Sequence, residues 1–181
     1  MSDPVPGDAF RALMRRVPSP VVVITAQGAT EARGITIGSF TSLALEPPLV
    51  SFNVGCASRM HAVMDACDRF AVHVLGERQA HLAKRFAIPG ITSTEQFEGV
   101  RYQRDRYGTP VLDGVSAVMH CVHHDSIVAG DHELYVGRVV ELEKPPDQGA
   151  VLYYQSGYHG VGSELPSREF SPVKRVSSES S

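Results

Sequence analysis

The sequence has no tryptophan and few cysteines. Its three cysteines, Cys56, Cys67 and Cys121, are widely spaced and form no Cys-x-x-Cys pair. An odd count with such spacing excludes a disulfide framework and agrees with a reducing compartment. The sequence also lacks an apolar run of the ~20 residues that a membrane span needs, and its first residues lack the apolar stretch of a signal peptide. These absences predict a cytoplasmic protein that does not bind a membrane.

Fingerprints of several enzyme classes are missing as well. The chain has no Gly-x-Gly-x-x-Gly or Gly-x-x-x-x-Gly-Lys-Ser/Thr motif for a nucleotide phosphate, and no Gly-x-Ser-x-Gly nucleophile elbow. The net charge of −3 disfavours a surface built for nucleic acid. The length of 181 residues and the hydrophobic fraction of 43% suit a single globular domain with a buried core.

What the sequence does contain is a series of short strand-like runs separated by turn signals. Because these runs follow one another directly instead of alternating with helices, they favour a mostly β protein, an antiparallel barrel, over a doubly wound sheet. We expect one domain over residues 1–162 and a polar, disordered tail over 163–181. The predicted strands cover residues 21–25, 34–45, 49–54, 70–75, 115–124, 132–143 and 151–154.

Three helices are predicted from apolar spacing and capping residues. They cover residues 8–17, with Asp8 as N-cap, 58–68, with Ser58 as N-cap, and 77–87. Residues 88–114 carry several Gly and Pro turn signals and little periodicity, so we expect a long surface excursion there.

The run 34–42, Gly-Ile-Thr-Ile-Gly-Ser-Phe-Thr-Ser, is unusual for a core strand. Gly34 and Gly38 remove side chains, which allows close approach to the backbone. Ser39, Thr41 and Ser42 add short hydroxyl donors and acceptors. The run is therefore either a half-exposed strand whose polar positions meet water, or a strand shaped to receive a flat ring with polar edges.

Other polar positions also have two interpretations. Ser58 and Arg59 open a helix, where an anion site or a plain N-cap is expected. Lys84 and Arg85 lie late in a helix, where the helix dipole alone explains them unless they face the same anion. His132 begins a strand after a Gly-Asp turn, a position suited to ligand contact, although such turns are routine.

The run Met119-His-Cys-Val-His-His-Asp125 raises the alternative of a metal site. On a strand, however, His120 and His124 face one side while Cys121 and His123 face the other. Alternation separates the candidate ligands, so we expect ordinary strand positions and no metal centre.

Together, these stretches resemble the short-chain flavin reductases, the reductase components of two-component flavin-dependent monooxygenases. The similarity extends from about residue 10 to residue 158 and implies a flavin-binding split β-barrel, usually a homodimer. It is carried by residues 16–25, 34–42, 46–49, 70–75, 84–87, 130–132 and 152–154.

The resemblance implies an NAD(P)H:flavin oxidoreductase that transfers hydride from NADH or NADPH to FMN, or to FAD, and supplies reduced flavin to a partner monooxygenase. The alternative is a split barrel that binds flavin without reducing it. His132 is expected near the nicotinamide, as the candidate catalytic residue. The implied flavin-binding residues are Thr36, Ser39, Phe40, Thr41, Asn53, Ser58, Lys84, Arg85, Phe86, Ala87, Tyr154 and Tyr158.

Three positions depart from the family pattern. Gly38 stands where many members carry a second Ser, and His73 replaces a common Asn. Met60 stands where a hydroxyl often helps to hold the phosphate. The last departure favours a flavin that exchanges with solution.

Overall fold

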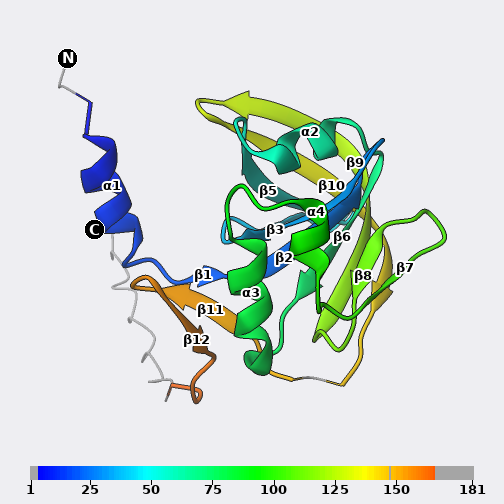
Figure 1. Cartoon of the computed structure of the whole chain (residues 1–181). Coiled ribbons are helices and arrows are strands. Elements are labelled where there is room, and N and C mark those ends of the chain that lie inside the picture. The colour runs from blue at the N-terminus through cyan, green and yellow to red at the C-terminus, as the bar shows by residue number, and fades with distance from the viewer. Residues whose placement is uncertain (1–3, 147, 166–181) are drawn as a thin grey trace, which may run out of the picture.

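The structure is a computed structural model that describes residues 4–146 and 148–165. Figure 1 shows short helices around a curved, strand-rich body. The helices are α1 (Gly7–Met14), α2 (Arg59–Asp65), α3 (Ala80–Phe86) and α4 (Ser93–Phe97), with the 3-10 turn η1 (Glu77–Gln79) before α3. The strands are β1 (Ser19–Pro20), β2 (Val22–Gln27), β3 (Ala32–Ile37), β4 (Thr41–Ala44), β5 (Leu49–Gly55), β6 (Arg69–Val74), β7 (Tyr102–Arg104), β8 (Pro110–Leu112), β9 (Ala117–Ala129), β10 (His132–Glu143), β11 (Val151–Tyr154) and β12 (Gly157–Gly160).

The main sheet has seven strands in the order β3-β2-β6-β9-β10-β5-β4, and every pairing in it is antiparallel. Its two edge strands, β3 and β4, are consecutive in the sequence and are joined only by residues 38–40. So short a link brings the opposite edges of the sheet together, which requires the sheet to roll up. The predicted antiparallel barrel is confirmed.

The core lies on both faces of the rolled sheet. Val22 and Ile24 of β2 belong to a cluster with Phe52 and Phe70, whereas Val23, between them, belongs to a second cluster beneath α3 and β8. A strand buried on both faces is apolar at consecutive positions rather than at alternate ones. This explains the unbroken Val-Val-Val-Ile run of the sequence.

Two predicted strand boundaries are wrong, one where the barrel closes and one at the β9–β10 hairpin. The run 34–42 is not one strand: β3 ends at Ile37 and β4 begins at Thr41, after the chain has passed between the two sheet edges. The residues between the predicted strands 115–124 and 132–143 are mostly strand, because β9 continues to Ala129 and pairs with the start of β10.

The excursion at 88–114 is also more ordered than expected, since it contains α4, β7 and β8. Strand β12 was not foreseen. The N-cap of α1 is Pro6, not Asp8, whose carboxylate lies within the first turn and pairs with Arg11. Only the first residues of the predicted tail, 163–165, lie within the described part of the chain.

Helix α1 stands apart from the barrel, beside β1 and the β11–β12 hairpin (Figure 1). None of its residues is buried, although Phe10 and Leu13 form an apolar stripe on it. Across residues 4–146 and 148–165, no helix has the length and apolar character that a membrane crossing requires.

Candidate functional site

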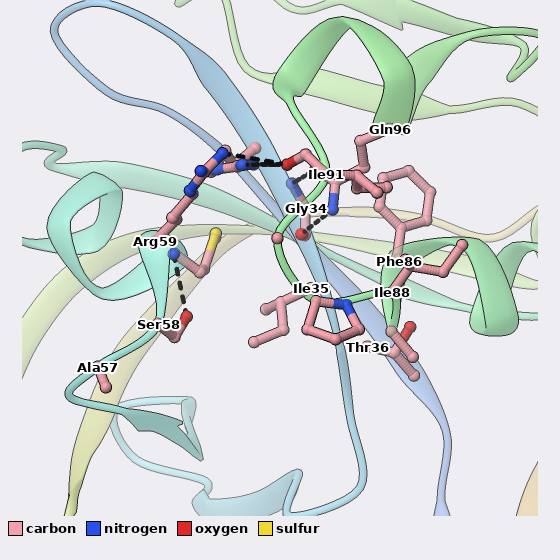
Figure 2. A pocket seen from close by; sticks show the side chains of 15 residues that line it. Gly34, Ile35, Thr36, Ala57, Ser58, Arg59, Phe86, Ile88, Ile91 and Gln96 are labelled. Carbon is pink, nitrogen blue, oxygen red and sulfur yellow. Dashed lines mark hydrogen bonds between the residues drawn. The ribbon is translucent and has the colours of Figure 1, made fainter.

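A pocket of about 440 Å³ lies where three helices meet one strand. Helices α2, α3 and α4 all contact β3. The pocket is lined by residues 33–36 of β3, residues 57–60 at the start of α2, residues 86–91 at the end of α3 and beyond it, and Gln96 of α4 (Figure 2). The volume falls within the range of about 300–1,000 Å³ typical of small-molecule sites.

Gly34 supports one wall of this pocket. A Cβ atom at residue 34 would lie 2.6 Å from the Phe86 ring, a distance that side chains do not tolerate. The space that a Cβ atom would occupy is filled by the Phe86 ring, while Gly34 itself lines the pocket. Gly38 differs, since its nearest neighbour would be Ser19, at 3.4 Å.

Gln96 completes the edge of β3 beside the pocket. Its side-chain amide donates to the Gly34 carbonyl oxygen at 2.8 Å, and its amide oxygen accepts from the Gly34 N–H at 2.9 Å. Strand β3 pairs with β2 alone, so these two bonds replace a neighbouring strand. Sequence reasoning missed Gln96 because it treated its segment as loop.

One end of the pocket is cationic. The Arg33 guanidinium donates to the Ile91 carbonyl oxygen at 2.6 Å and 3.3 Å. Arg59 donates to the same oxygen at 3.4 Å (Figure 2). Arg33 is buried, whereas Arg59 is exposed. The Arg59–Ile91 distance lies near the limit for a hydrogen bond, so the Arg59 guanidinium can turn to an anion at little cost.

Ser58 stands beside these arginines as the N-cap of α2. Its Oγ accepts a hydrogen bond from the Met60 N–H at 3.0 Å, which confirms the predicted N-cap. A hydroxyl that accepts this bond retains its own O–H for donation. The N-cap and anion-site interpretations of Ser58 are therefore compatible.

Four of the predicted flavin-binding residues line the pocket: Thr36, Ser58, Phe86 and Ala87. The Thr36 hydroxyl donates to the Ala83 carbonyl oxygen at 2.7 Å, which ties β3 to α3. Phe86 is buried, and its ring packs edge-on against Phe97 with centroids 5.4 Å apart.

Four more predicted residues gather at the link between β3 and β4, outside the pocket lining. Ser39 Oγ accepts from the Asn53 N–H at 2.9 Å, so the link is bound to β5. Phe40 packs against the barrel core, while Thr41 is exposed on β4. Ser39, Phe40 and Thr41 therefore follow the part of β3 that lines the pocket.

The remaining predicted flavin-binding residues lie elsewhere. Arg85 donates to the carbonyl oxygens of Glu95 and Glu98, so it holds α4 rather than lining the pocket. Lys84 is exposed on α3. Tyr154 and Tyr158 belong to the β11–β12 hairpin, where Tyr158 packs against the second core cluster.

His132 lies at the first position of β10, opposite Gly55. Its Nδ1 is 2.7 Å from the Asp131 carboxylate, and the ring is about half exposed. The hydrogen bond from His132 holds the Asp131 pKa below its usual range. Gly55 lies two residues before Ala57, which lines the pocket, so His132 stands close to the pocket without lining it.

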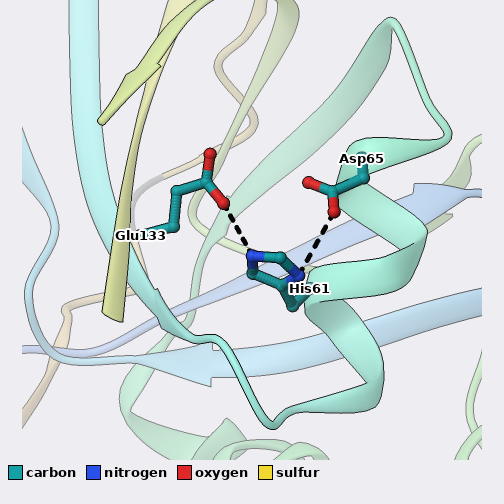
Figure 3. A group of neighbouring side chains, drawn as sticks. All are labelled: His61, Asp65 and Glu133. Carbon is teal, nitrogen blue, oxygen red and sulfur yellow. Dashed lines mark hydrogen bonds and ion pairs between the residues drawn. The ribbon is translucent and has the colours of Figure 1, made fainter. Parts of the chain in front are cut away.

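The histidine run of β9 does not form a group that could share an ion. His120 pairs with Glu143 at 2.7 Å, and a bulge between Val136 and Gly137 leaves His124 without a partner in the ladder. Strict alternation, which the sequence argument assumed, is broken there. Within the described residues, the cluster with metal-type ligands is instead His61, Asp65 and Glu133 (Figure 3).

The pocket has the chemistry that a flavin phosphate needs. Its cationic end offers the Ser58 hydroxyl and the Arg59 guanidinium to an anion. Ile35, Phe86 and Ile88 supply apolar walls next to this end. Apolar walls with a few convergent polar groups are typical of cofactor sites.

Comparison with known proteins gives the same family as the sequence. The family model described as "Flavin reductase like domain" matches residues 14–162. A flavin reductase of Pseudomonas putida is 35% identical over 85% of this chain and 89% of its own. An NADH:riboflavin 5'-phosphate oxidoreductase of Streptomyces pristinaespiralis is 36% identical over 83% of this chain and 86% of its own.

Solved structures agree. The NADH:FAD oxidoreductase SgcE6 of Streptomyces globisporus superposes with a TM-score of 0.80 at 32% identity, over 90% of this chain and 98% of that one. The flavin reductase component of a bacterial two-component tryptophan halogenase superposes with a TM-score of 0.79 at 28% identity, over 88% of this chain and 100% of that one. A putative oxidoreductase of Sinorhizobium meliloti gives 0.78 at 33% identity, but this chain spans only 53% of it. The chain belongs to the flavin reductase like domain family, and the split barrel and oxidoreductase class predicted from its sequence are confirmed.

Proposed function

We propose that this protein is an NAD(P)H:flavin oxidoreductase that transfers hydride to FMN or FAD. The observation that carries the proposal is the pocket against β3, which has a cationic end and apolar walls in a chain of the flavin reductase family. We take NADH as the preferred donor because four curated relatives are named for NADH. A flavin-binding protein without reductase activity is the alternative.

The protein's contribution is to position and bind. Flavin, when bound, supplies the hydride-accepting chemistry. The Ser58 hydroxyl and the Arg59 guanidinium would hold its phosphate, and Ser39 and Thr41 of the β3–β4 link would hold its ring. His132 binds the nicotinamide amide or ribose from the start of β10. No nucleophile or acid–base dyad is required, because hydride transfer depends on holding two rings in contact.

Reduced flavin is expected to leave for a second enzyme. One structural neighbour is the reductase component of a tryptophan halogenase, and another is component B of nitrilotriacetate monooxygenase from Mycobacterium thermoresistibile. We propose a flavin-dependent monooxygenase as the partner of this chain. We also propose a homodimer, with the exposed apolar stripe of α1 as part of its interface.

An NADH-oxidation assay with and without added FMN tests the function. We expect oxidation that depends on flavin and that is slower with NADPH. FAD in place of FMN then identifies the preferred flavin. An absorbance spectrum of the purified protein shows whether flavin stays bound. Protein that retains flavin but oxidises neither nicotinamide would favour the binding-only alternative.

A further inference from the structure

Helix α2 and the start of β10 are joined by a group of ionisable side chains outside the pocket. His61 of α2 lies between two carboxylates (Figure 3). Its Nε2 is 2.6 Å from the Glu133 carboxylate and its Nδ1 is 3.2 Å from that of Asp65. The Tyr135 hydroxyl donates to Asp65 at 2.8 Å and is 3.3 Å from Glu133.

Glu133 is the most buried carboxylate of this group. Its side chain is 11% exposed, against 51% for Asp65. Hydrogen bonds from Ser126, His61 and Tyr135 hold its pKa below the usual range. A carboxylate buried to this degree needs charged or hydrogen-bonding partners, so its position depends on them.

The ligand types of this group would also suit a transition metal. The geometry favours a histidine held by the two carboxylates instead. Both ring nitrogens of His61 face carboxylate oxygens at contact distance, so neither directs a lone pair to a point shared by all three groups. A bound ion would have to displace at least one of these contacts.

The two ends of the His61–Glu133 contact adjoin the two places where the proposed reaction is assembled. His61 directly follows residues 58–60, which line the pocket. Glu133 directly follows His132. The inner face of α2 is anchored in the core by Met60, Val63 and Met64, which leaves His61 to fix its other face against β10.

We propose that His61 is a positioning residue, which holds His132 in place relative to the flavin pocket through Glu133. The inference rests on the proposed function, since it assigns the nicotinamide side of the reaction to His132. Loss of His61 removes the 2.6 Å contact to the buried Glu133 carboxylate. The first residues of β10, which stay paired with β5 and β9, then adjust their position. His132 then moves away from the donor while the pocket keeps its lining.

Anaerobic stopped-flow reduction of FMN by NADH tests this with His61→Ala, His132→Ala and the double variant. We expect His61→Ala to lower kcat/KM for NADH about tenfold, because a displacement of about 1 Å can cost still more. Its Kd for FMN should stay close to that of the wild type. In the His132→Ala background, His61→Ala should add no further loss. His61→Gln, whose amide can still donate to Glu133, should recover part of the rate.

The matched control is His81→Ala, which removes an exposed histidine of α3 whose Nδ1 lies 3.2 Å from the Arg78 carbonyl oxygen. Losses that multiply in the double variant would overturn the proposal, because they would show that His61 acts independently of His132. Stoichiometric metal that is bound by the wild type and lost in His61→Ala would overturn it too. Should His61→Ala fail to fold, Glu133→Gln replaces it in the same cycle.

An NMR readout separates this inference from the proposed function. The imidazole Cε1–H signal of His132 should shift in His61→Ala, whatever the activity. An unchanged signal would overturn the positioning role, whereas wild-type protein that binds FMN without reducing it would overturn the function alone.

Discussion

At the scale of single residues, His73 shows why a departure from the family pattern is tolerated. Its Nδ1 lies 3.0 Å from the Val23 carbonyl oxygen, and its Nε2 accepts from the Leu112 N–H at 3.1 Å. The ring is therefore neutral and connects β2 with β8. Burial lowers the His73 pKa from 6.5 to about 4.

His73 should make stability depend on pH. The unfolded chain takes up a proton near pH 6.5, whereas the folded protein resists until about pH 4. The contribution of neutral His73 to the free energy of unfolding is fully present above pH 6.5 and is lost as the pH falls towards 4. Between pH 7 and pH 5 the loss is about 2 kcal/mol. Urea unfolding at both pH values measures it. The control is His73→Asn, whose loss of stability between these pH values should be smaller by that amount; an equal loss in both proteins would contradict the assignment.

Gly34→Ala should damage the pocket from within. The new Cβ atom would meet the Phe86 ring at 2.6 Å, and the ring is confined by Phe97. Such overpacking costs about 1–3 kcal/mol, and a displaced Phe86 should weaken FMN binding. Denaturant midpoints and flavin titration measure the two effects. Gly38→Ala is the control, because its neighbours begin at 3.4 Å; equal damage in both variants would refute the packing argument.

At the scale of elements, the sequence predicts what is locally determined. Ser58 and the apolar spacing behind it predict α2, because an N-cap bond and one buried face are both properties of neighbouring residues. Helix α4 was missed although Thr92 and Glu95 form a local capping box at its start. Its five residues are too few for a periodic signal, and distant contacts, through Gln96 to β3 and Phe97 to Phe86, stabilise them. The closure of the barrel at 38–40 is likewise a property of the sheet and not of the local run.

Gln96→Ala tests how far α4 supports β3. The variant leaves the buried N–H and carbonyl of Gly34 without partners, at about 1–3 kcal/mol for each group. We expect lower stability and faster hydrogen exchange at the Gly34 amide. Gln103→Ala, on the exposed strand β7, is the matched control. Unchanged exchange at Gly34 would show that water replaces the Gln96 amide.

At the scale of the molecule, the family and the barrel could be predicted from the order and spacing of weak motifs. Which residues come together at the pocket could not be predicted from the sequence. Arg33 and Gln96 reach the pocket from segments 63 residues apart, and neither carries a local signal of function. Lys84 and Arg85 had such a signal, yet Arg85 supports α4.

The exposed stripe of α1 makes the oligomeric state testable. Phe10 and Leu13 are 58% and 61% exposed, which is costly for a free helix in water. We expect the double variant Phe10→Asp/Leu13→Asp to shift a dimer towards monomer in sedimentation experiments. Arg11→Asp changes the charge of the same helix without removing apolar area and should stay dimeric. A wild-type monomer would rule out the proposed homodimer.

The three residues between β3 and β4 hold the two edges of the rolled sheet together. Within residues 4–146 and 148–165, this three-residue link is what joins the two edge strands in sequence, so its length limits how far apart they can lie. Inserting residues into this link would let β3 and β4 separate and would move Ser39 away from Asn53. A single proteolytic cut within the link would free the two strands from each other.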